Sequence, residues 1–245
     1  MLETIFLSDD KIFHTIEGEG EYVGKPSIFM RLSMCNLTCK GFASKDSPYG
    51  CDSFVSWSVK NRYTVDELVE YFSTLDYVKF LEQGQILKIT GGEPLLQQKV
   101  LIEFIERFKA KYKFIPRIDF ETNATILPLP EWSEKYFATF TTSPKLASNG
   151  DPEEKRYKPE VLNWHARNGS GFKFVINSKD DFNEIITKYI EPFNISSKKV
   201  WLMPCCGSRE EHVKVAGDIA ELCKLSGYNF SPRLQLVIWD KALKV

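Results

Sequence analysis

Hydrophobic residues recur along the chain with two different spacings. Short apolar runs such as SIFMRLSM (27–34) and ILKIT (86–90) have the length and composition of buried strands. Between such runs, apolar residues recur at i, i+3, i+4 and i+7, which places them on one face of a helix. This spacing predicts helices over 64–81, 98–111, 181–191 and 208–226. Further strands are expected over 117–122, 137–143, 171–177, 199–204 and 233–239.

The order of these elements predicts the fold class. Two of the helices begin with a capping box, Thr64 with Glu67 and Ser208 with Glu211. Strands that alternate with helices are typical of an α/β protein with a mainly parallel sheet. The number of strand–helix steps favours a complete or partial (β/α) barrel over two separate domains. We therefore expect residues 1–245 to form a single domain.

Unusual residues end or follow five of the predicted strands. The stretches are Cys35, Gly91-Gly92-Glu93-Pro94, Thr122-Asn123, Ser143-Pro144-Lys145 and Met203-Pro204. The carboxyl ends of parallel strands meet at one edge, and in barrels of this type that edge carries the chemistry. Packing alone does not require special residues at five strand ends, so the pattern predicts a functional site there.

Composition excludes several classes of partner. The chain is 43% hydrophobic and 27% charged with a net charge of -1, so no charge pattern predicts binding to nucleic acid or to a membrane surface. No run approaches the roughly 18 apolar residues of a membrane helix, and MLETIFLSDDK lacks the features of a signal peptide. We expect a cytoplasmic protein whose six cysteines are reduced rather than paired in disulfides.

Three cysteines, Cys35, Cys39 and Cys51, gather in one short stretch. Reduced thiols in a cluster are typically metal ligands or catalytic groups. Three thiols leave a four-iron cluster with one iron open to an external chelate. A zinc ion instead could take its fourth ligand from Cys205, Cys206 or His14. A cysteine can also serve only as a small buried apolar side chain, and this role is favoured for Cys205, Cys206 and Cys223.

The glycine-rich turn after the strand 86–90 bears on the choice between zinc and an iron–sulfur cluster. Gly91-Gly92 lets a backbone pass close to a ligand, although a tight strand–helix turn needs the same residues. Together, CNLTC, the third cysteine and GGEP resemble the radical S-adenosylmethionine superfamily. The resemblance implies that three cysteines hold a [4Fe–4S] cluster whose open iron binds the amino and carboxyl groups of S-adenosylmethionine.

Motifs along nearly the whole chain narrow the resemblance. They are EGEG, an arginine four residues before the first cysteine, CDS, ITGGEP, FETNAT, TTSPK and VWLMP. This set resembles the 7-carboxy-7-deazaguanine synthase family, which implies a modified, incomplete (β/α) barrel. The implied reaction converts 6-carboxy-5,6,7,8-tetrahydropterin to 7-carboxy-7-deazaguanine with loss of ammonia, on the route to queuosine and other 7-deazapurines. The resemblance also implies Mg²⁺, a homodimer, and flavodoxin or ferredoxin as electron donor.

The resemblance also implies roles for individual residues. Contacts to the pterin fall on Ile16, Glu17, Gly18, Arg31 and Thr90. Contacts to S-adenosylmethionine fall on Gly92, Ser143, Pro144 and Lys145, with Glu121, Met203, Pro204 and Cys205 as further candidates. Ser53 stands in the place of a threonine that ligates Mg²⁺. No catalytic acid or base is assigned, and only His14 and His165 are considered as proton donors.

Physical chemistry supports some of these roles and leaves alternatives open. A carboxylate at Glu17 can accept from the N–H groups of an aminopyrimidine. The planar guanidinium of Arg31 can hold a carboxylate with two hydrogen bonds, although a purely structural partner would also explain an arginine in a strand. A hydroxyl at Ser53 is an oxygen ligand that Mg²⁺ accepts, although Asp52-Ser53 also suits a simple turn.

Three features depart from the family pattern. Eleven residues separate Cys39 from Cys51, so the cluster-binding loop at 35–51 is lengthened. Glu17 stands where glutamine is frequent, and Ala124 stands where glycine usually follows the ETN segment. Two other functions stay open, namely a different radical S-adenosylmethionine enzyme such as a glycyl-radical activase, and a zinc-stabilised binding protein without catalysis.

Overall fold

The computed structural model describes residues 4–42 and 50–241. Within them, nine strands form one sheet in the order β3-β1-β2-β4-β5-β6-β7-β8-β9. The strands are β1 (Thr4–Ile16), β2 (Pro26–Leu32), β3 (Asn61–Thr64), β4 (Ile86–Gly91), β5 (Arg117–Thr122), β6 (Thr139–Thr142), β7 (Gly171–Ile176), β8 (Val200–Pro204) and β9 (Asn229–Phe230). Neighbours from β2 to β9 run parallel, whereas β1 is antiparallel to both β2 and β3. The predicted mainly parallel sheet is confirmed.

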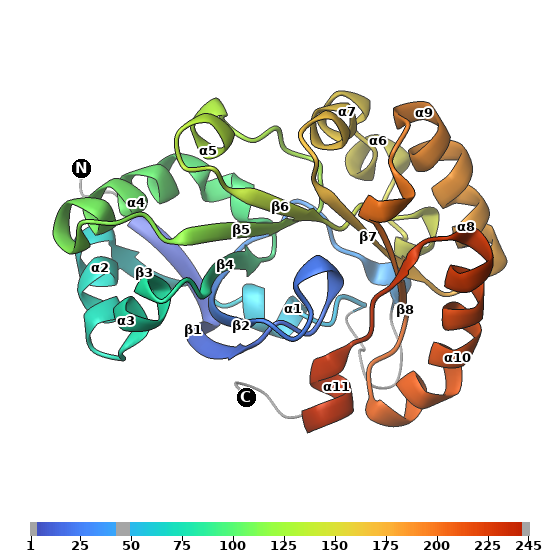
Figure 1. Cartoon of the computed structure of the whole chain (residues 1–245), viewed down its shortest axis with the longest axis horizontal. Helices are drawn as coiled ribbons and strands as arrows, with labels where there is room; N and C mark the ends of the chain where they lie inside the picture. The colour runs from blue at the N-terminus through green and yellow to red at the C-terminus, as the bar shows by residue number, and fades with distance from the viewer. Residues whose placement is uncertain (1–3, 43–49, 242–245) are drawn as a thin grey trace.

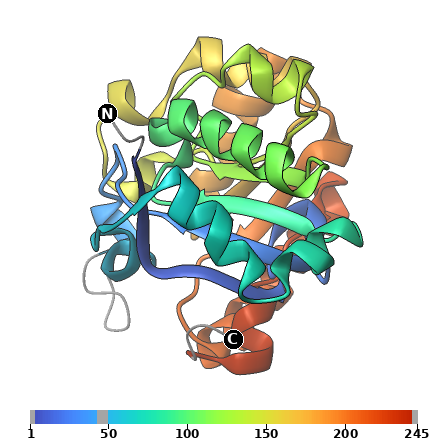
Figure 2. The same cartoon turned by 90° about the vertical axis from the view of Figure 1, so that its left-hand side faces the viewer.

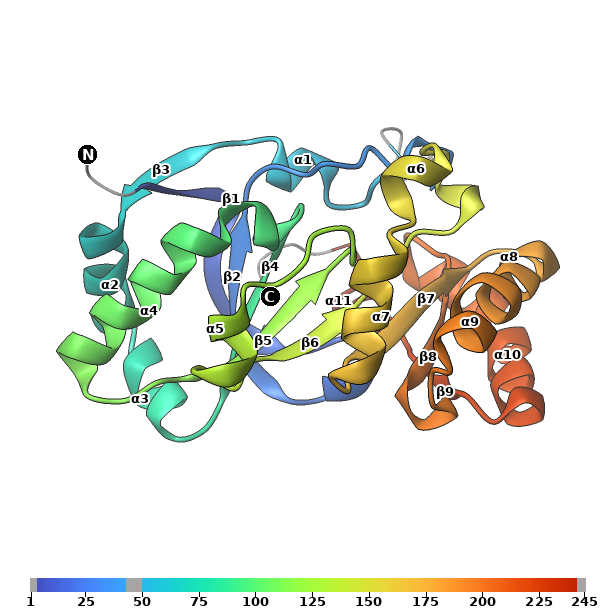
Figure 3. The same ribbon diagram turned by 90° about the horizontal axis from the view of Figure 1, so that it is seen from above.

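Most helices cover the outer side of this curved sheet, whereas α1 and α11 do not lie in this outer layer (Figures 1 and 3). The helices are α1 (Phe54–Trp57), α2 (Val65–Ser73), α3 (Tyr77–Glu82), α4 (Gln98–Tyr112), α5 (Pro130–Glu134), α6 (Glu153–Arg156), α7 (Pro159–Arg167), α8 (Lys179–Glu184), α9 (Glu191–Phe193), α10 (Arg209–Ser226) and α11 (Leu234–Trp239). In the described residues β3 and β9 are the two edges and do not pair, so the barrel is incomplete, as predicted. No described helix has the length and apolar character that crossing a membrane requires.

The hydrophobic core lies between the outer face of the sheet and these helices. Leu87 and Ile89 of β4 pack in one buried cluster with Phe104 and Phe108 of α4, and Figure 2 shows α2 and α4 in front of the sheet. Because side chains alternate along a strand, the residue between Leu87 and Ile89 points to the opposite, inner face. That residue is Lys88, so the inner face carries a charged side chain where the outer face carries apolar ones.

Several elements differ from the sequence-based prediction. The single helix expected over 64–81 is two helices, α2 and α3, because Asp76 adopts a left-handed backbone with φ 54°. The segment 181–191 is mainly helical, but it contains a π-helical turn at Ile185–Ile190. The strands β1 and β3 were not predicted.

The strand expected over 233–239 is wrong, because this segment forms helix α11. Its alternating apolar residues suit a strand, but the N–H of Leu234 donates to the carbonyl of Gly18 instead of to a neighbouring strand. The backbone then closes local hydrogen bonds from Leu236 and Val237 to the carbonyl of Arg233. Tertiary contacts therefore override the local pattern.

Candidate active site

The strand ends meet at one edge, as the sequence predicts. Parallel register pairs Leu32 with Gly91, Thr122 with Thr142, and Ile176 with Pro204, and each is at the end of its strand. The residues that follow these ends are therefore neighbours along the same edge. They include Cys35, Gly92, Asn123, Ser143 and Cys205.

The glycine turn after β4 packs directly against the cysteine loop, residues 34–42. The N–H of Glu93 donates to the carbonyl of Met34 at 2.8 Å. A Cβ added at Gly92 would lie 2.0 Å from the Met34 carbonyl oxygen and 2.8 Å from the Cβ of Cys35. Such distances exclude any side chain, so the chain's own cysteine loop already requires glycine at position 92.

Glu93 connects the glycine turn to the turn after β5. Its carboxylate accepts hydrogen bonds from the backbone N–H of Leu95 and Asn123 and from the hydroxyl of Thr122, at 2.8–3.0 Å. The side chain is fully buried, and this burial raises the pKa of Glu93 to about 7. Glu93 therefore holds the two turns together from within the protein, and its carboxylate is not exposed at the surface of the site.

The three clustered thiols lie within electrostatic reach of one another. Burial raises the pKa of all three, that of Cys35 to about 12, and Cys39 and Cys51 add to the shift at Cys35. Among the described residues, no three histidine, cysteine or carboxylate side chains stand together as a metal site. In kind, a set of three thiols fits an iron–sulfur cluster, whose positive iron would stabilise the thiolate forms. The ligand set itself stays a prediction.

Two of the three additional ligands considered for zinc, His14 and Cys206, have other partners, whereas Cys205 follows β8 at the carboxyl edge and is half-buried. His14 pairs with Ile28 near the start of β2, and its Nε2 contacts Gln85 Oε1 at 2.8 Å, so it lies away from the carboxyl edge. The Sγ of Cys206 lies 3.6 Å from Nδ1 of His212. Cys206 and Cys223 are buried, in keeping with the expectation that they are small hydrophobes.

The two histidines considered as proton donors are both unsuitable. His14 is excluded because it lies on the outer face of the sheet, opposite the core residue Ile28 and stacked on Phe80 of α3. His165 is fully buried against Phe140 and Trp164, and its Nδ1 contacts Ser170, the residue before β7 begins. Burial lowers the pKa of His165 to about 3, so its ring is neutral near pH 7 and is not the imidazolium that a general acid requires.

A charged cluster fills the inner face of the sheet. Lys88 of β4 lies 2.8 Å from Glu17 and 2.7 Å from Asp119 of β5, and all three side chains are almost fully buried. Burial would lower the pKa of Lys88, but the two carboxylates outweigh it and raise that pKa. Burial raises the pKa of Glu17, and Lys88 offsets only part of the shift.

A second set of ion pairs extends this cluster toward the carboxyl edge. Lys173 of β7 lies 2.5 Å from both Glu19 and Glu121. Arg233 then joins Glu19, at 3.1 Å, to Asp52, at 2.5 Å. Burial would raise the pKa of Glu19 and of Glu121, but the cations outweigh it, so both carboxyls titrate below their usual range.

Sequence reasoning missed most of this charged cluster. Lys88 and Lys173 are lysines in the middle of apolar strands, ILKIT and GFKFVIN, and Asp119 occupies the same kind of position in RIDFET. A charged residue is rarely fully buried unless it is paired, so three of them at alternating strand positions were a usable signal. Arg233 was hidden because its segment was expected to be a strand.

The residues predicted to bind the pterin lie around the charged cluster. Arg31 is opposite Thr90 in the parallel register, so both side chains share the inner face. The hydroxyl of Thr90 lies 3.4 Å from Glu121. Glu17 and Gly18 follow β1, which ends at Ile16. The C-terminal segment covers this point, because a Cβ at Gly18 would lie 1.9 Å from the side chain of Gln235.

The residues predicted to contact S-adenosylmethionine and Mg²⁺ lie along the carboxyl edge. The Nζ of Lys145 donates to the hydroxyl of Ser143 at 2.9 Å, and Ser143 itself is buried. Met203 and Pro204 end β8, and the N–H of Cys205 donates to the carbonyl of Ile176. Ser53 precedes α1 without capping it, and its hydroxyl instead contacts Asp52 at 3.1 Å.

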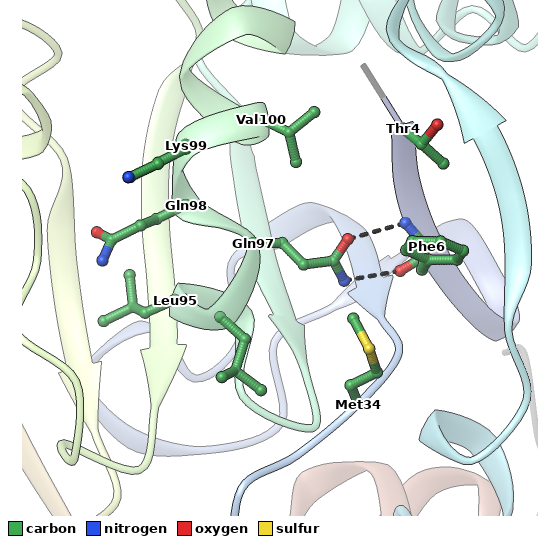
Figure 4. A pocket seen from close by; sticks show the side chains of 9 residues that line it. Thr4, Phe6, Met34, Leu95, Gln97, Gln98, Lys99 and Val100 are labelled. Carbon is green, nitrogen blue, oxygen red and sulfur yellow. Dashed lines mark hydrogen bonds between the residues drawn. The ribbon is translucent and has the colours of Figure 1, made fainter. Parts of the chain in front are cut away.

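A cavity of about 400 Å³ lies elsewhere (Figure 4). It is bounded by β1, by Met34 and by the short helix η3 (Pro94–Gln97) with the start of α4. The amide of Gln97 pairs there with the backbone N–H and carbonyl of Phe6, at 2.8 and 3.0 Å. None of the predicted site residues lines this cavity, but Met34 of the cysteine loop does, so the cavity adjoins the candidate active site without forming part of it.

Comparison with known proteins identifies the family. Residues 16–126 match the model of a 4Fe-4S single cluster domain. A 7-carboxy-7-deazaguanine synthase from Pyrobaculum aerophilum is 28% identical over 95% of this chain and 94% of its own length. The enzyme of the same name from Hyperthermus butylicus is 30% identical over 93% and 91%. The chain belongs to the 7-carboxy-7-deazaguanine synthase family. A further member, from Halobacterium salinarum, is 27% identical over 95% of this chain.

Solved structures support the fold of this family. The crystal structure of QueE from Escherichia coli covers 94% of this chain with a TM-score of 0.62 at 18% identity, and this chain covers 93% of it. A structure of anSMEcpe with bound AdoMet covers 82% of this chain, with a TM-score of 0.52 at 17% identity, and 61% of anSMEcpe is matched. At these identities the likeness establishes the fold, an open (β/α) barrel.

Proposed function

We infer that this chain catalyses the reaction for which its family is named, the ring contraction of 6-carboxy-5,6,7,8-tetrahydropterin to 7-carboxy-7-deazaguanine with loss of ammonia. The observation that carries the inference is that three motifs are connected across the inner side of the open sheet. The cysteine loop and the GGEP turn pack against each other at the carboxyl edge, and Arg233 forms ion pairs both with Glu19 of the EGEG segment and with Asp52, which follows Cys51. A glycyl-radical activase would share the first two motifs but not EGEG together with Arg31.

We assign the cluster to Cys35, Cys39 and Cys51. When bound there, the [4Fe–4S] cluster would supply the electron for reductive cleavage of S-adenosylmethionine, which is the source of the radical chemistry. The protein's part is to hold this chemistry in a fixed orientation and to keep water away from it. Glu93 contributes by locking the cysteine loop to the turns after β4 and β5. Flavodoxin or ferredoxin is the electron donor that we propose.

The inner face would hold the pterin. Arg31 would bind its carboxylate with two hydrogen bonds, which suits the planar guanidinium. Glu17 would accept hydrogen bonds from the aminopyrimidine end, and Lys88 holds the carboxylate of Glu17 in place at 2.8 Å. Thr90, together with Ile16 and Gly18 on either side of Glu17, completes the set of substrate contacts that we propose.

Ser53 would ligate Mg²⁺ beside the substrate carboxylate. Mg²⁺ prefers oxygen ligands and keeps several waters, so a single protein hydroxyl is sufficient. The Ser53 hydroxyl does not cap α1, and because it donates its proton to Asp52 at 3.1 Å, its oxygen lone pairs can face a cation. Bound Mg²⁺ would hold the substrate carboxylate in a defined orientation as the ring rearranges.

S-adenosylmethionine would lie along the carboxyl edge between β4 and β8. Gly92 and the segment Ser143-Pro144-Lys145 would provide its main contacts, because Gly92 borders the cysteine loop and the segment directly follows β6 at the same edge. The further contacts that we propose are Glu121, Met203, Pro204 and Cys205. We also propose that the chain acts as one domain and as a homodimer, which sedimentation of the purified protein tests.

The test is an anaerobic assay with reconstituted protein, 6-carboxytetrahydropterin, S-adenosylmethionine, Mg²⁺ and a reductant. Mass spectrometry should detect 7-carboxy-7-deazaguanine. Formation of 5′-deoxyadenosine without this product would indicate a different radical enzyme, and a protein containing zinc but no iron would indicate a binding protein. Arg31→Gln should weaken substrate binding strongly, whereas Arg167→Gln, at an exposed position on α7, should not.

A further inference from the structure

The loop after β6 holds the second cysteine of the cysteine loop. Asp151 accepts hydrogen bonds from the backbone N–H of Thr38 at 3.1 Å, from the Thr38 hydroxyl at 2.9 Å and from the N–H of Cys39 at 2.9 Å. Cys39 has a left-handed backbone with φ 50°, a conformation that costs an ordinary residue about 1 kcal/mol. The carboxylate of Asp151 therefore holds Cys39 in a turn that it would not readily adopt alone.

Asn149, which is fully buried, makes a direct contact with the sulfur of Cys39. Its Nδ2 lies 3.5 Å from Cys39 Sγ and 2.9 Å from Asp151 Oδ2, so the two N–H bonds of one amide serve both groups. Its Oδ1 accepts from the N–H of Asp151 at 2.9 Å, which fixes the orientation of the amide. Two hydrogen bonds with Asp151 thus orient the N–H that faces the sulfur.

The two loops also touch through their backbones. A Cβ added at Gly41 would lie 2.0 Å from the Ser148 carbonyl oxygen and 2.9 Å from the backbone nitrogen of Gly150. Gly150 itself has φ +81°, which glycine adopts without strain. Glycine at both positions lets residues 148–151, here called the clasp, lie directly on the cysteine loop.

The clasp is anchored on its far side by a buried arginine. Arg156 donates to the carbonyl of Lys145 at 2.9 Å and to Glu184 at 2.7 Å. Glu184 in turn accepts from the N–H of Ala147 at 2.8 Å. The segment that leads into the clasp is therefore held by α6 and α8, so the clasp is a rigid support rather than a free loop.

We propose that Asn149 and Asp151 are positioning residues for the iron–sulfur cluster, a role that rests on the proposed function. Asp151 fixes the turn that presents Cys39, and the N–H of Asn149 donates to the Cys39 sulfur. A hydrogen bond to a cluster sulfur stabilises the more negative, reduced cluster and so raises its reduction potential. Asp151 thus controls how firmly the cluster is held, and Asn149 controls how readily it accepts an electron.

The test compares Asp151→Asn and Asn149→Leu with wild type and with Asp218→Asn. Asp218 is exposed on α10, so this control removes one charge far from the site. After anaerobic reconstitution, three quantities are measured: iron and sulfide per chain, the rate of iron release to a chelator, and the midpoint potential of the one-electron couple followed by electron paramagnetic resonance. Circular dichroism of the cluster-free chains checks their folding.

Asp151→Asn should release iron roughly tenfold faster, because an amide offers one acceptor oxygen in place of two and loses a charge-assisted bond. Asn149→Leu should retain the cluster but lower the reduced-to-oxidised ratio at a fixed potential by about tenfold, which is a shift of about 59 mV for one electron. A merely structural role would not move this potential while leaving the iron content unchanged.

Release rates and potentials equal to those of Asp218→Asn would overturn the proposal. If a variant does not fold, Thr38→Val, which removes one hydrogen bond to Asp151, and Asn149→Ser, which removes the amide that donates to the Cys39 sulfur, are measured in its place with the same expected directions. If wild type itself binds no iron, the proposed function fails. If wild type binds iron and the variants match it, only the clasp fails.

Discussion

Replacing Lys88 with methionine tests the charged cluster on the inner face most sharply. Lys88 is 2% exposed and lies between the buried carboxylates of Glu17 and Asp119, at 2.8 and 2.7 Å. Methionine keeps the length and apolar character of the stem but removes the charge. The two carboxylates then lose their shared cation inside the protein, although Asp119 keeps hydrogen bonds from Thr139 and Thr141.

The expected loss of stability follows from these distances. Each pair at about 2.7 Å attracts by about 6 kcal/mol at an effective dielectric constant of 20. In the wild-type protein, the free-energy cost of removing water from the ammonium group offsets much of that attraction. The variant does not incur this cost. Breaking a buried ion pair by removing one partner costs about 3–5 kcal/mol net, which is a large part of the 5–15 kcal/mol that stabilises a typical domain.

The assay is urea unfolding of the cluster-free chain, followed by circular dichroism at pH 7. The control is Lys214→Met, because Lys214 is an exposed lysine paired with Glu210 on α10 and such surface pairs contribute at most about 0.5 kcal/mol. Lys88→Met should lose several kcal/mol more than the control. A difference below about 1 kcal/mol would refute the reasoning that the inner face depends on buried charge pairing.

Three further predictions concern the turns and the cap. The raised pKa of Glu93 means that the folded chain binds its proton more tightly than the unfolded chain, whose value is about 4.5. Its stabilising contribution, up to about 3 kcal/mol, is therefore full below pH 4.5 and is lost as the pH rises through about 7, so Glu93→Gln should flatten urea-unfolding stability over this range. Gly92→Ala should prevent the cysteine loop from docking and abolish iron incorporation, which iron analysis checks, whereas Gly217→Ala, in open space on α10, should leave it unchanged. Lys113, the residue that caps the carboxyl end of α4, has a left-handed backbone with φ 69°, which glycine adopts without strain. Lys113→Gly should therefore raise the free energy of unfolding by about 1 kcal/mol, measured by thermal unfolding, and a decrease would contradict this explanation of the cap.

Hydrophobic spacing predicted the architecture because parallel strands and amphipathic helices have distinct periods. The strands 86–90 and 117–122 and the helix 98–111 correspond to β4, β5 and α4 within a residue or two. The segment 233–239 failed because a contact with Gly18, far away in sequence, decides its conformation. No local pattern contains that information.

The candidate site was predictable in part. Residue roles came from the family resemblance, since spacing alone left zinc and iron–sulfur chemistry open. The departure at Ala124 now has a physical reason, because this residue has φ 59°, a conformation that glycine adopts more easily. The clasp was invisible in the sequence, because Asn149 and Asp151 are brought to Cys39 by strands β2 and β6, which are separated in the sheet by β4 and β5.

The most direct measurement of the central claim is electron paramagnetic resonance of the reduced, reconstituted protein with and without S-adenosylmethionine. We predict the signal of a reduced [4Fe–4S] cluster that changes shape when S-adenosylmethionine binds the open iron, and its loss in variants with Cys35, Cys39 or Cys51 replaced by alanine. A protein without iron, or a cluster signal that S-adenosylmethionine leaves unchanged, would contradict the account.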